Sequence, residues 1–295
     1  MPTVAENLNR WGGDYPWTLG GHEWSKPWGG AEAQWFGAIL PRIHGFLPAE
    51  TILEIAPGFG RWTHYLKGHC RRMILVDLAP KCIEHCKELF SSSSHITYHV
   101  NDGKSLAMVP DNSVDFVFSF DSLVHAESDV LQAYLAQLER KLTPDGVGFI
   151  HHSNIGEYRI RWALKTRLVP GLVRRYLYRK GLMDYYHWRS FSMTAGRFEE
   201  HCKHAGLQCI SQELVNWKAG LLVDCFSLFT KKSSVWARPN VVFRNFNFMK
   251  EVEYIARLSS LYSVSNLQDG KLGPPLREPS QPPHRLPHRP PALRV

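Results

Sequence analysis

Three apolar runs in the first half of the chain each end in residues that could hold a polar, ring-containing ligand. The first run leads into the turn Ala56-Pro-Gly-Phe-Gly60, the second ends at Asp77, and the third is followed by Asp102 and Gly103. A glycine lets the backbone approach a ligand closely, and an acid about 20 residues after such a turn can accept hydrogen bonds from both ribose hydroxyls. Asp102 can accept a bond from an adenine amino group, with Gly103 leaving room for the ring. Taken alone, the turn also fits an ordinary strand-to-helix connection, but the spacing of the acids predicts a site for a nucleoside-containing cofactor.

Three histidines follow the next two apolar runs. His125 comes after the run 114–120, and His151 and His152 lie at the end of the run 147–151. A histidine suits proton removal near pH 7, and a positioned base contributes about 10²- to 10⁴-fold to such a step. We favour His125 as the base and place His152 second, because neighbouring strand residues point to opposite faces and only one of the pair can face a site. The alternative is that these side chains only cap strand ends or orient loops.

The residues at the ends of these two strands give weaker support for a metal site than for a catalytic base. Asp121 with His151 and Asn154 could hold a divalent cation, but three such ligands at strand ends are too common to specify one. Cys82 and Cys86 stand four residues apart without a second pair at zinc spacing. We therefore predict no metal site, and we expect the six cysteines to be reduced thiols.

Alternating strands and helices are needed to bring these residues together. The apolar runs predict strands at 52–56, 73–77, 95–100, 114–120 and 147–151, separated by helices at 61–67, 80–90 and 128–142. A helix at 194–205 and strands at 207–215 and 224–230 follow, the last two as a terminal hairpin. The pattern predicts an α/β protein with a doubly wound, seven-stranded, mostly parallel sheet whose last strand is antiparallel.

The remaining sequence divides into additions to this sheet. Residues 1–47 form a tryptophan-rich N-terminal cap with a helix at 31–46, and residues 48–232 form the main domain with a basic helical insertion at 155–190. Residues 233–262 form a C-terminal helical extension with a helix at 249–262. Residues 263–295 are rich in proline and cannot bury a core, so we expect a disordered tail.

Positive charge is concentrated in the insertion. The chain has a formal net charge of +8, and eight cations without an acid lie between Arg159 and Lys180. This composition fits an anionic membrane surface or a phosphorylated substrate, and it fits equally a solvated helix face. Nucleic acid is an unlikely partner because no recognition module is present. No run of 18 apolar residues and no secretory signal is visible, so we expect a cytoplasmic protein, with attachment to the inner face of the membrane left open.

The order of motifs also resembles a known family. Glu-x-Ala-x-Gly-x-Gly, Val-Asp-Leu, Asn-Asp-Gly, Asp-Phe-Val-Phe-Ser-Phe-Asp and Leu-Thr-Pro-Asp-Gly, over residues 50 to about 230, resemble class I S-adenosylmethionine-dependent methyltransferases. Ser119-Phe-Asp-Ser-Leu-Val-His125 and Phe149-Ile-His-His-Ser-Asn154 further resemble bacterial members associated with sugars and surface polysaccharides. The resemblance implies S-adenosylmethionine as cofactor. It places Glu54, Ala56, Gly58 and Gly60 at the methionine and ribose side, Asp77 and Leu78 at the ribose, Asp102 and Gly103 at the adenine, and Ser119, Phe120 and Asp121 around the methionine portion and sulfonium.

The sequence is compatible with three functions. The leading one is methyl transfer to a hydroxyl of a sugar, glycan or other polar small molecule, with a histidine as general base. The second is transfer to a nitrogen or to another small metabolite, because an amine lone pair needs less help from a base. The third is a catalytically silent cofactor-binding or membrane-surface scaffold. The sequence names neither the acceptor nor the oligomeric state.

Overall fold

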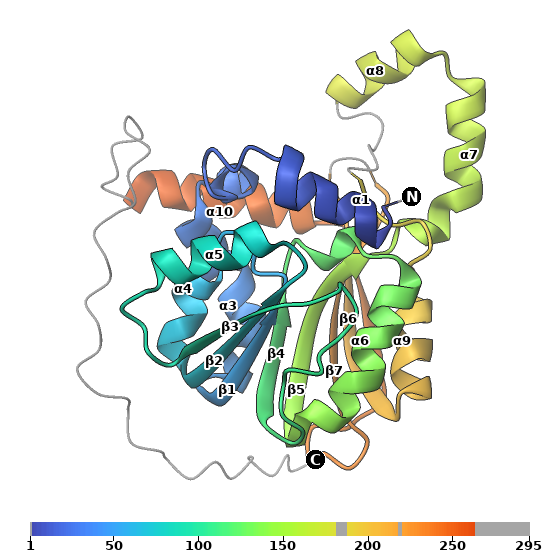
Figure 1. Ribbon diagram of the computed structural model, residues 1–295. Coiled ribbons are helices and arrows are strands. Elements are labelled where there is room, and N and C mark those ends of the chain that lie inside the picture. Colours follow the sequence, from blue (N-terminus) through green and yellow to red (C-terminus); the bar gives the residue numbers. More distant parts are fainter. Residues whose placement is uncertain (1, 181–187, 218–219, 263–295) are drawn as a thin grey trace. The chain divides into compact units, whose positions relative to one another are not determined.

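An eight-stranded sheet forms the centre of the protein (Figure 1). The computed structural model describes residues 2–180, 188–217 and 220–262 of the 295-residue chain. The strand order is β3-β2-β1-β4-β5-β7-β6-β8. The strands are β1 (Ala49–Ile55), β2 (Cys70–Asp77), β3 (Ile96–Val100), β4 (Val114–Ser119), β5 (Leu142–Ser153), β6 (Leu207–Val215), β7 (Asp224–Lys231) and β8 (Val241–Asn245). The predicted α/β class and mostly parallel sheet are confirmed, with β7 running antiparallel to β5 and β6.

The predicted strand count of seven was wrong, because an eighth strand lies in the C-terminal extension. β8 pairs with β6 in parallel, from Ser211 opposite Val241 to Val215 opposite Asn245. The first four residues of β8 are exposed, so it lacks the buried alternating face on which strand prediction relies. Its Val-Val-Phe core is nevertheless typical of strands. The predicted helix after it is present as α10 (Phe248–Tyr262).

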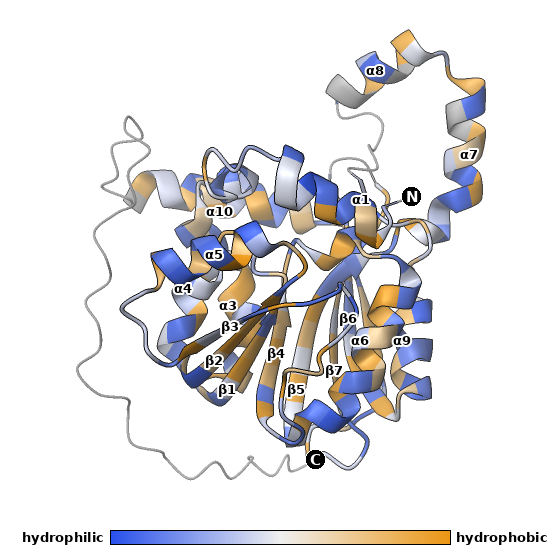
Figure 2. Ribbon diagram, viewed as in Figure 1, coloured by the Kyte–Doolittle hydropathy of each residue, from blue (hydrophilic) through white to orange (hydrophobic). Residues whose placement is uncertain are grey.

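Both faces of the sheet are covered, as doubly wound sheets require. One face packs Ile52, Phe116 and Phe149 against the N-terminal helices and α10. The other packs Leu53 and Val117 against α6 (Ser128–Lys141) and α9 (Ala195–His204). Consecutive residues of a strand are thus buried on opposite faces, and this is why the strand sequences are continuous apolar runs. Figure 2 shows the same pattern, with apolar strands inside and mixed helices outside.

The helices of the main domain follow the predicted order with one shortened member. They are α4 (Thr63–Leu66) with the turn η5 (Lys67–His69), α5 (Pro80–Leu89), η6 (Leu123–His125), α6 (Ser128–Lys141) and α9 (Ala195–His204). The helix predicted from residue 61 begins at Thr63, because the glycine-containing turn continues through Trp62. The Thr194 side chain caps α9 by accepting a bond from the backbone N–H of Arg197.

The N-terminal cap is more helical than predicted. It contains α1 (Val4–Asn9), η1 (Arg10–Asp14), η2 (His22–Trp28), α2 (Ala31–Gln34), η3 (Trp35–Ile39), α3 (Leu40–Ile43) and η4 (His44–Phe46). The last four form the helical stretch predicted for residues 31–46. Thr3 and Glu6 form a reciprocal capping box that starts α1. The Asn7 side chain donates a 2.9 Å hydrogen bond to the carbonyl of His125, so α1 is tied to η6, the turn that follows β4.

Of the segment predicted as a helical insertion, 155–190, the structure describes residues 155–180 and 188–190. Residues 155–180 contain η7 (Ile155–Tyr158), α7 (Arg159–Leu168) and α8 (Gly171–Arg179), of which Figure 1 labels the last two. The described residues resume at Trp188. In the part of the chain that the structure describes, every helix is too short or too polar to cross a membrane. The predicted disordered tail, residues 263–295, lies outside the described residues.

Candidate functional site

A cavity lies at the carboxyl ends of β1, β2 and β4, beneath the N-terminal cap. It holds about 770 Å³ of empty space, part of it open to solvent. Ligands of open α/β sheets bind at this edge of the sheet. The strand ends contribute Ala56, Gly58, Asp77, Leu78, Gly103, Asp121, Ser122, Leu123 and His125; the cap contributes Val4, Asn7, Trp11, Trp17 and Trp24; and helices add Cys82, Val130 and Tyr134.

The turn after β1 is held in a demanding conformation. Ala56 has a φ of 57° and Gly58 a φ of 58°, both in the left-handed region. A side chain at Gly58 would place its Cβ 2.8 Å from the indole ring of Trp17, so glycine allows the cap to close over the turn. Ala56, which is not a glycine, keeps this conformation at an energetic cost. Such outliers concentrate at ligand sites.

Asp77 forms the polar wall beside this turn. Its carboxylate accepts hydrogen bonds from the backbone N–H groups of Gly58 at 3.1 Å and Ala79 at 2.8 Å. Burial raises the pKa of Asp77 to about 6, although both bonds oppose that shift. Each oxygen keeps a lone pair, so the group can still accept from ligand hydroxyls. Asp77 therefore stands where the sequence predicted it.

Gly103 allows helix α1 to approach the same cavity. Its φ is +84°, and an added Cβ would lie 2.9 Å from Val4 and 3.3 Å from Leu78. Both neighbours line the cavity. The glycine predicted to leave room for a ring thus leaves room for the apolar side chains that close the pocket.

Three other predicted cofactor residues support the cavity from outside it. Glu54 is buried beneath the turn and accepts a 2.6 Å hydrogen bond from the Thr63 hydroxyl, and burial raises its pKa to about 8. Gly60 faces α5, where a Cβ would lie 2.6 Å from the Phe90 ring. Asp102 is exposed, and its carboxylate accepts from the backbone N–H groups of the two residues after Gly103. The two hydrogen bonds to the Asp102 carboxylate close a local turn.

Ser119 and Phe120 also lie outside the cavity lining. Ser119 is fully buried within the sheet. Phe120 packs among aromatic rings, with ring centroids 5.7 Å from Trp62, 4.8 Å from His151 and 5.4 Å from Phe226. Of the predicted segment 119–121, the cavity is lined by Asp121.

His125 is the predicted catalytic histidine that lines the cavity. Its Nδ1 lies 3.0 Å from the carbonyl oxygen of Trp188, and its ring lies 5.2 Å from the ring of Trp11. A carbonyl can only accept, so Nδ1 carries the proton and Nε2 is the acceptor atom of the ring. Burial lowers the pKa of His125 to about 4, so the imidazole is neutral at pH 7.

His151 and His152 point to opposite faces, as strand geometry predicts. His152 stacks on Phe198 of α9 at 4.4 Å, and its Nε2 lies 2.8 Å from the Ser227 hydroxyl. Burial lowers its pKa to about 4. Neither histidine lines the cavity. His152 is therefore held within the packing between sheet and helix.

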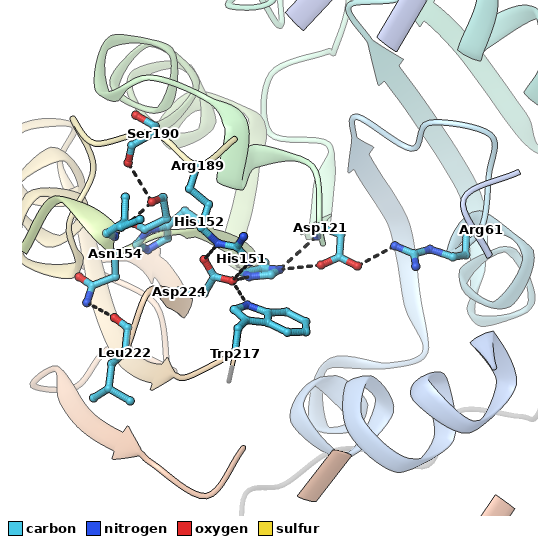
Figure 3. A network of polar contacts seen from close by, with 12 residues as sticks. Arg61, Asp121, His151, His152, Asn154, Arg189, Ser190, Trp217, Leu222 and Asp224 are labelled. Carbon is cyan, nitrogen blue, oxygen red and sulfur yellow. Dashed lines mark hydrogen bonds and ion pairs between the residues drawn. The ribbon is translucent and has the colours of Figure 1, made fainter. Parts of the chain in front are cut away.

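A buried chain of charges links His151 to the cavity (Figure 3). Asp121 lies 2.7 Å from Arg61 and 3.4 Å from Nδ1 of His151. On the other side of the ring, Nε2 lies 3.2 Å from Asp224, which Arg189 binds through two contacts of 2.5 and 2.6 Å. Burial alone would lower the pKa of His151, but its bond to Asp121 and the Asp224 carboxylate raise it. Of these five linked residues, Asp121 is the one that also lines the cavity.

Sequence reasoning missed Arg61, Arg189 and Asp224. Arg61 directly follows the glycine-containing turn, and Arg189 closes the aromatic run 185–189, but neither position reveals its partner. Asn154, considered above as a metal ligand, uses its side-chain oxygen to accept from Ala195 N–H. In the described part of the chain, no group of three His, Cys, Asp or Glu residues is arranged to hold a metal ion.

Aromatic side chains of the cap form the roof of the cavity, here called the aromatic roof and defined as Trp11, Tyr15, Trp17 and Trp24. Their ring centroids lie within 6.1 Å of one another. Trp17 also stacks on Phe59 of the turn at 4.4 Å. All three indoles line the cavity. The tryptophan-rich cap of the sequence therefore contributes directly to the site.

Comparison with known proteins identifies similar chains. Residues 52–146 match the family described as methyltransferase domain. Phosphoethanolamine N-methyltransferase 1 of Triticum aestivum is 30% identical over 118 residues, which is 39% of this chain and 23% of that protein. Nodulation protein S of Rhizobium tropici is 26% identical over 140 residues, 45% of this chain and 52% of that protein. This chain thus spans about half or less of the length of these curated relatives.

The fold also matches a solved structure. The PH0226 protein of Pyrococcus horikoshii OT3 superposes with a TM-score of 0.51 at 17% identity, covering 73% of this chain and 94% of that one. An identity this low speaks for the arrangement of the sheet and helices alone.

Proposed function

We propose that the chain carries a class I S-adenosylmethionine-dependent methyltransferase domain and that it methylates a nitrogen of a small amine. The observation that carries the proposal is the state of His125, the neutral, tautomer-fixed imidazole of the cavity. The curated relative named as a phosphoethanolamine N-methyltransferase supports the same chemistry.

The cofactor fits the residues that line the cavity. S-adenosylmethionine, when bound, supplies a methyl group activated by a sulfonium. Asp77 offers carboxylate oxygens to the ribose hydroxyls, and Gly58 lets the backbone approach the ligand closely. Leu78, Leu123 and Val130 offer apolar contacts to a flat ring.

His125 favours an amine over a hydroxyl as the acceptor. A hydroxyl must lose its proton as it attacks, and a base is most effective when its pKa lies near the working pH. A pKa of about 4 makes His125 a weak base but leaves Nε2 able to accept a hydrogen bond from an amine N–H. In the unprotonated form of the amine, which is the form that attacks, that bond would direct the nitrogen lone pair toward the methyl group. The hydroxyl methylation expected from sequence is therefore the second candidate.

The aromatic roof and Asp121 complement the charge of the reaction. Positive charge moves from the sulfonium to the acceptor nitrogen during transfer, and the faces of indole rings attract cations. Arg61 already lies 5.5 Å from the ring centroid of Trp24, which shows that this roof tolerates a cation. The same Arg61 lies 2.7 Å from the carboxylate of Asp121, so this acid is near the roof. The indole rings and the Asp121 carboxylate could therefore stabilise a cationic acceptor nitrogen without another acidic residue.

The proposal is tested by offering the full chain a library of small amines and a matched library of sugars and polyols. With isotope-labelled cofactor, we expect methylated products from amines. We also expect His125→Ala, which removes the hydrogen bond that orients the acceptor, to lower kcat by roughly tenfold to a hundredfold. Titration calorimetry should show that Asp77→Ala weakens cofactor binding by at least about tenfold. Asp145→Ala is the matched control, because Asp145 is exposed and outside the cavity.

Three results would contradict parts of this assignment. Products from hydroxyl acceptors alone would replace the amine by the second candidate. Unchanged cofactor affinity in Asp77→Ala would remove the proposed role of that carboxylate. Tight cofactor binding with no transfer to either library would favour the non-catalytic scaffold.

A further inference from the structure

Helices α7 and α8 expose an unusual number of apolar side chains. In α7, Ile160, Leu164 and Leu168 follow one another at intervals of four residues, so they form one stripe along the helix. Their exposed fractions are 79%, 54% and 74%. In α8, Leu172 and Tyr176 form the same kind of pair, exposed by 80% and 58%. Exposed apolar patches of this kind mark interaction surfaces.

The stripe does not face the protein's own core. The opposite face of α7 carries Trp162, which is 8% exposed and packs with Ile155, Leu221 and Val223. This side chain attaches the helix to the domain and leaves the stripe turned outward. The hydroxyl of Tyr158, just before α7, accepts a 3.2 Å bond from the backbone N–H of Leu222. Tyr158 and Trp162 therefore anchor the start of the insertion to the domain, and the apolar stripe stays exposed to solvent.

Cations flank the stripe and acids are missing. The eight Lys and Arg residues between Arg159 and Lys180 include Arg161, Arg167 and Arg175, all exposed, and no Asp or Glu interrupts them. Figure 2 shows hydrophobic and hydrophilic residues interleaved along both helices. Apolar stripes within a cationic, acid-free helix pair are the pattern of segments that lie in the plane of a membrane surface.

We propose that α7 and α8 bind the surface of an anionic lipid bilayer. The stripe of Ile160, Leu164 and Leu168 enters the boundary between headgroups and acyl chains, while the flanking cations contact lipid phosphates. A nucleic acid would satisfy the cations but would leave the aliphatic stripe in water. The combination of both features therefore favours a lipid surface. The proposal does not depend on the methyl acceptor.

The insertion also connects the bilayer to the site. The chain returns from it at Trp188 and Arg189. The carbonyl of Trp188 holds His125, and Arg189 holds Asp224 in the buried charge chain. A membrane bound by α7 and α8 would thus be in contact with a segment whose end orients the cavity histidine.

Vesicle binding of the full chain tests the proposal. We expect co-sedimentation with phosphatidylcholine vesicles that contain roughly one third phosphatidylserine, little binding to pure phosphatidylcholine, and loss of binding at high salt. The stripe variant Ile160→Ser/Leu164→Ser/Leu168→Ser and the charge variant Arg161→Glu/Arg167→Glu/Arg175→Glu should each lower the partition coefficient by about tenfold or more. Circular dichroism confirms that each variant is folded.

Matched variants elsewhere on the surface provide the controls. Leu89→Ser/Val235→Ser/Leu261→Ser removes three side chains that are also exposed, by 47%, 76% and 73%. Lys232→Glu/Arg238→Glu/Arg257→Glu reverses three exposed cations outside the insertion. Both should bind the anionic vesicles better than the corresponding insertion variants. The two charge variants change net charge equally, so a difference between them reports position.

Several outcomes would overturn the proposal. One is an absence of binding to anionic vesicles by the folded full chain. Another is a stripe variant that binds as tightly as the unmodified chain. Binding of duplex nucleic acid without binding of vesicles would assign the surface to nucleic acid. Self-association that the stripe variant abolishes, again without vesicle binding, would assign it to a second copy of the chain.

Discussion

Asp121 is the residue at which the cavity meets the buried charges. Its backbone φ is 65°, an uncommon conformation for a residue other than glycine, and it directs the carboxylate between Arg61 and His151. Burial alone would raise the pKa of Asp121, but His151 and Arg61 hold it below its ordinary value. The side chain is therefore ionised at neutral pH. A strained backbone held by two partners is a sign of preorganisation.

Because His152 is buried in its neutral form, we expect the stability of the protein to depend on pH. His152 is fully buried, and burial lowers its folded-state pKa to about 4, below the 6.5 of a free imidazole. Between these values the unfolded chain binds more protons than the folded chain. Its contribution to the free energy of unfolding is thus present above pH 6.5 and is lost as the pH falls toward 4, by up to about 1.4 kcal/mol per pH unit.

Urea unfolding of the native chain and of His152→Gln, followed across this pH window, measures that contribution. We expect the difference in unfolding free energy between the two proteins to shrink by roughly 1–3 kcal/mol on acidification, because glutamine does not titrate. A constant difference would show that His152 is not held neutral by burial.

At the scale of elements, the sequence predicted strands better than contacts between them. Apolar runs marked seven of the eight strands, because strands buried on both faces keep few polar residues. Local spacing likewise found Gly58, Asp77 and Gly103, which lie at neighbouring strand ends. Asp102 shows the limit of that reasoning. Its oxygens are taken by nearby backbone N–H groups, a local competition that strand position does not reveal.

Long-range partners could not be predicted in this way. Arg189 meets Asp224 only because the insertion returns the chain beside β7, and Arg61 meets Asp121 across two strand ends. Nothing in the separate segments specifies these pairs. The tryptophans of the cap are visible in the sequence, but which of their rings reach the cavity depends on how the cap folds back. Packing, rather than pattern, determines this part of the site.

Helix α1 and the third strand end provide a test at this scale. Gly103→Ala would strain a left-handed residue and place a Cβ against Val4, so we expect α1 to shift and cofactor affinity to fall by about tenfold. Adding Val4→Ala should restore part of the loss if contact with α1 is the cause. Gly196→Ala is the control, because this helical glycine meets no atom closer than 4.0 Å. Calorimetry that finds Gly103→Ala and the native chain equal would refute the contact.

At the scale of the whole molecule, two additions to the sheet have different relations to the cavity. The N-terminal cap supplies lining residues, including three indoles. The insertion supplies none between Arg159 and Lys180, within the described residues. The predicted cytoplasmic location stays a prediction, and the structure adds that no described helix is long and apolar enough to span a membrane. Cap and insertion should therefore respond differently to the cofactor.

Limited proteolysis with trypsin measures that difference within one molecule. Arg10 lies in the cap, and Arg161 and Arg167 lie in α7, all exposed. A ligand that binds the folded cavity at about 100 times its Kd stabilises it by roughly 2.7 kcal/mol, so openings of the cap become about a hundredfold rarer. We expect S-adenosylmethionine to slow cleavage at Arg10 strongly and to leave cleavage at Arg161 and Arg167 nearly unchanged. Equal protection of both segments would mean that the cap is not a separate cover of the site, and protection of neither would place the ligand away from the aromatic roof.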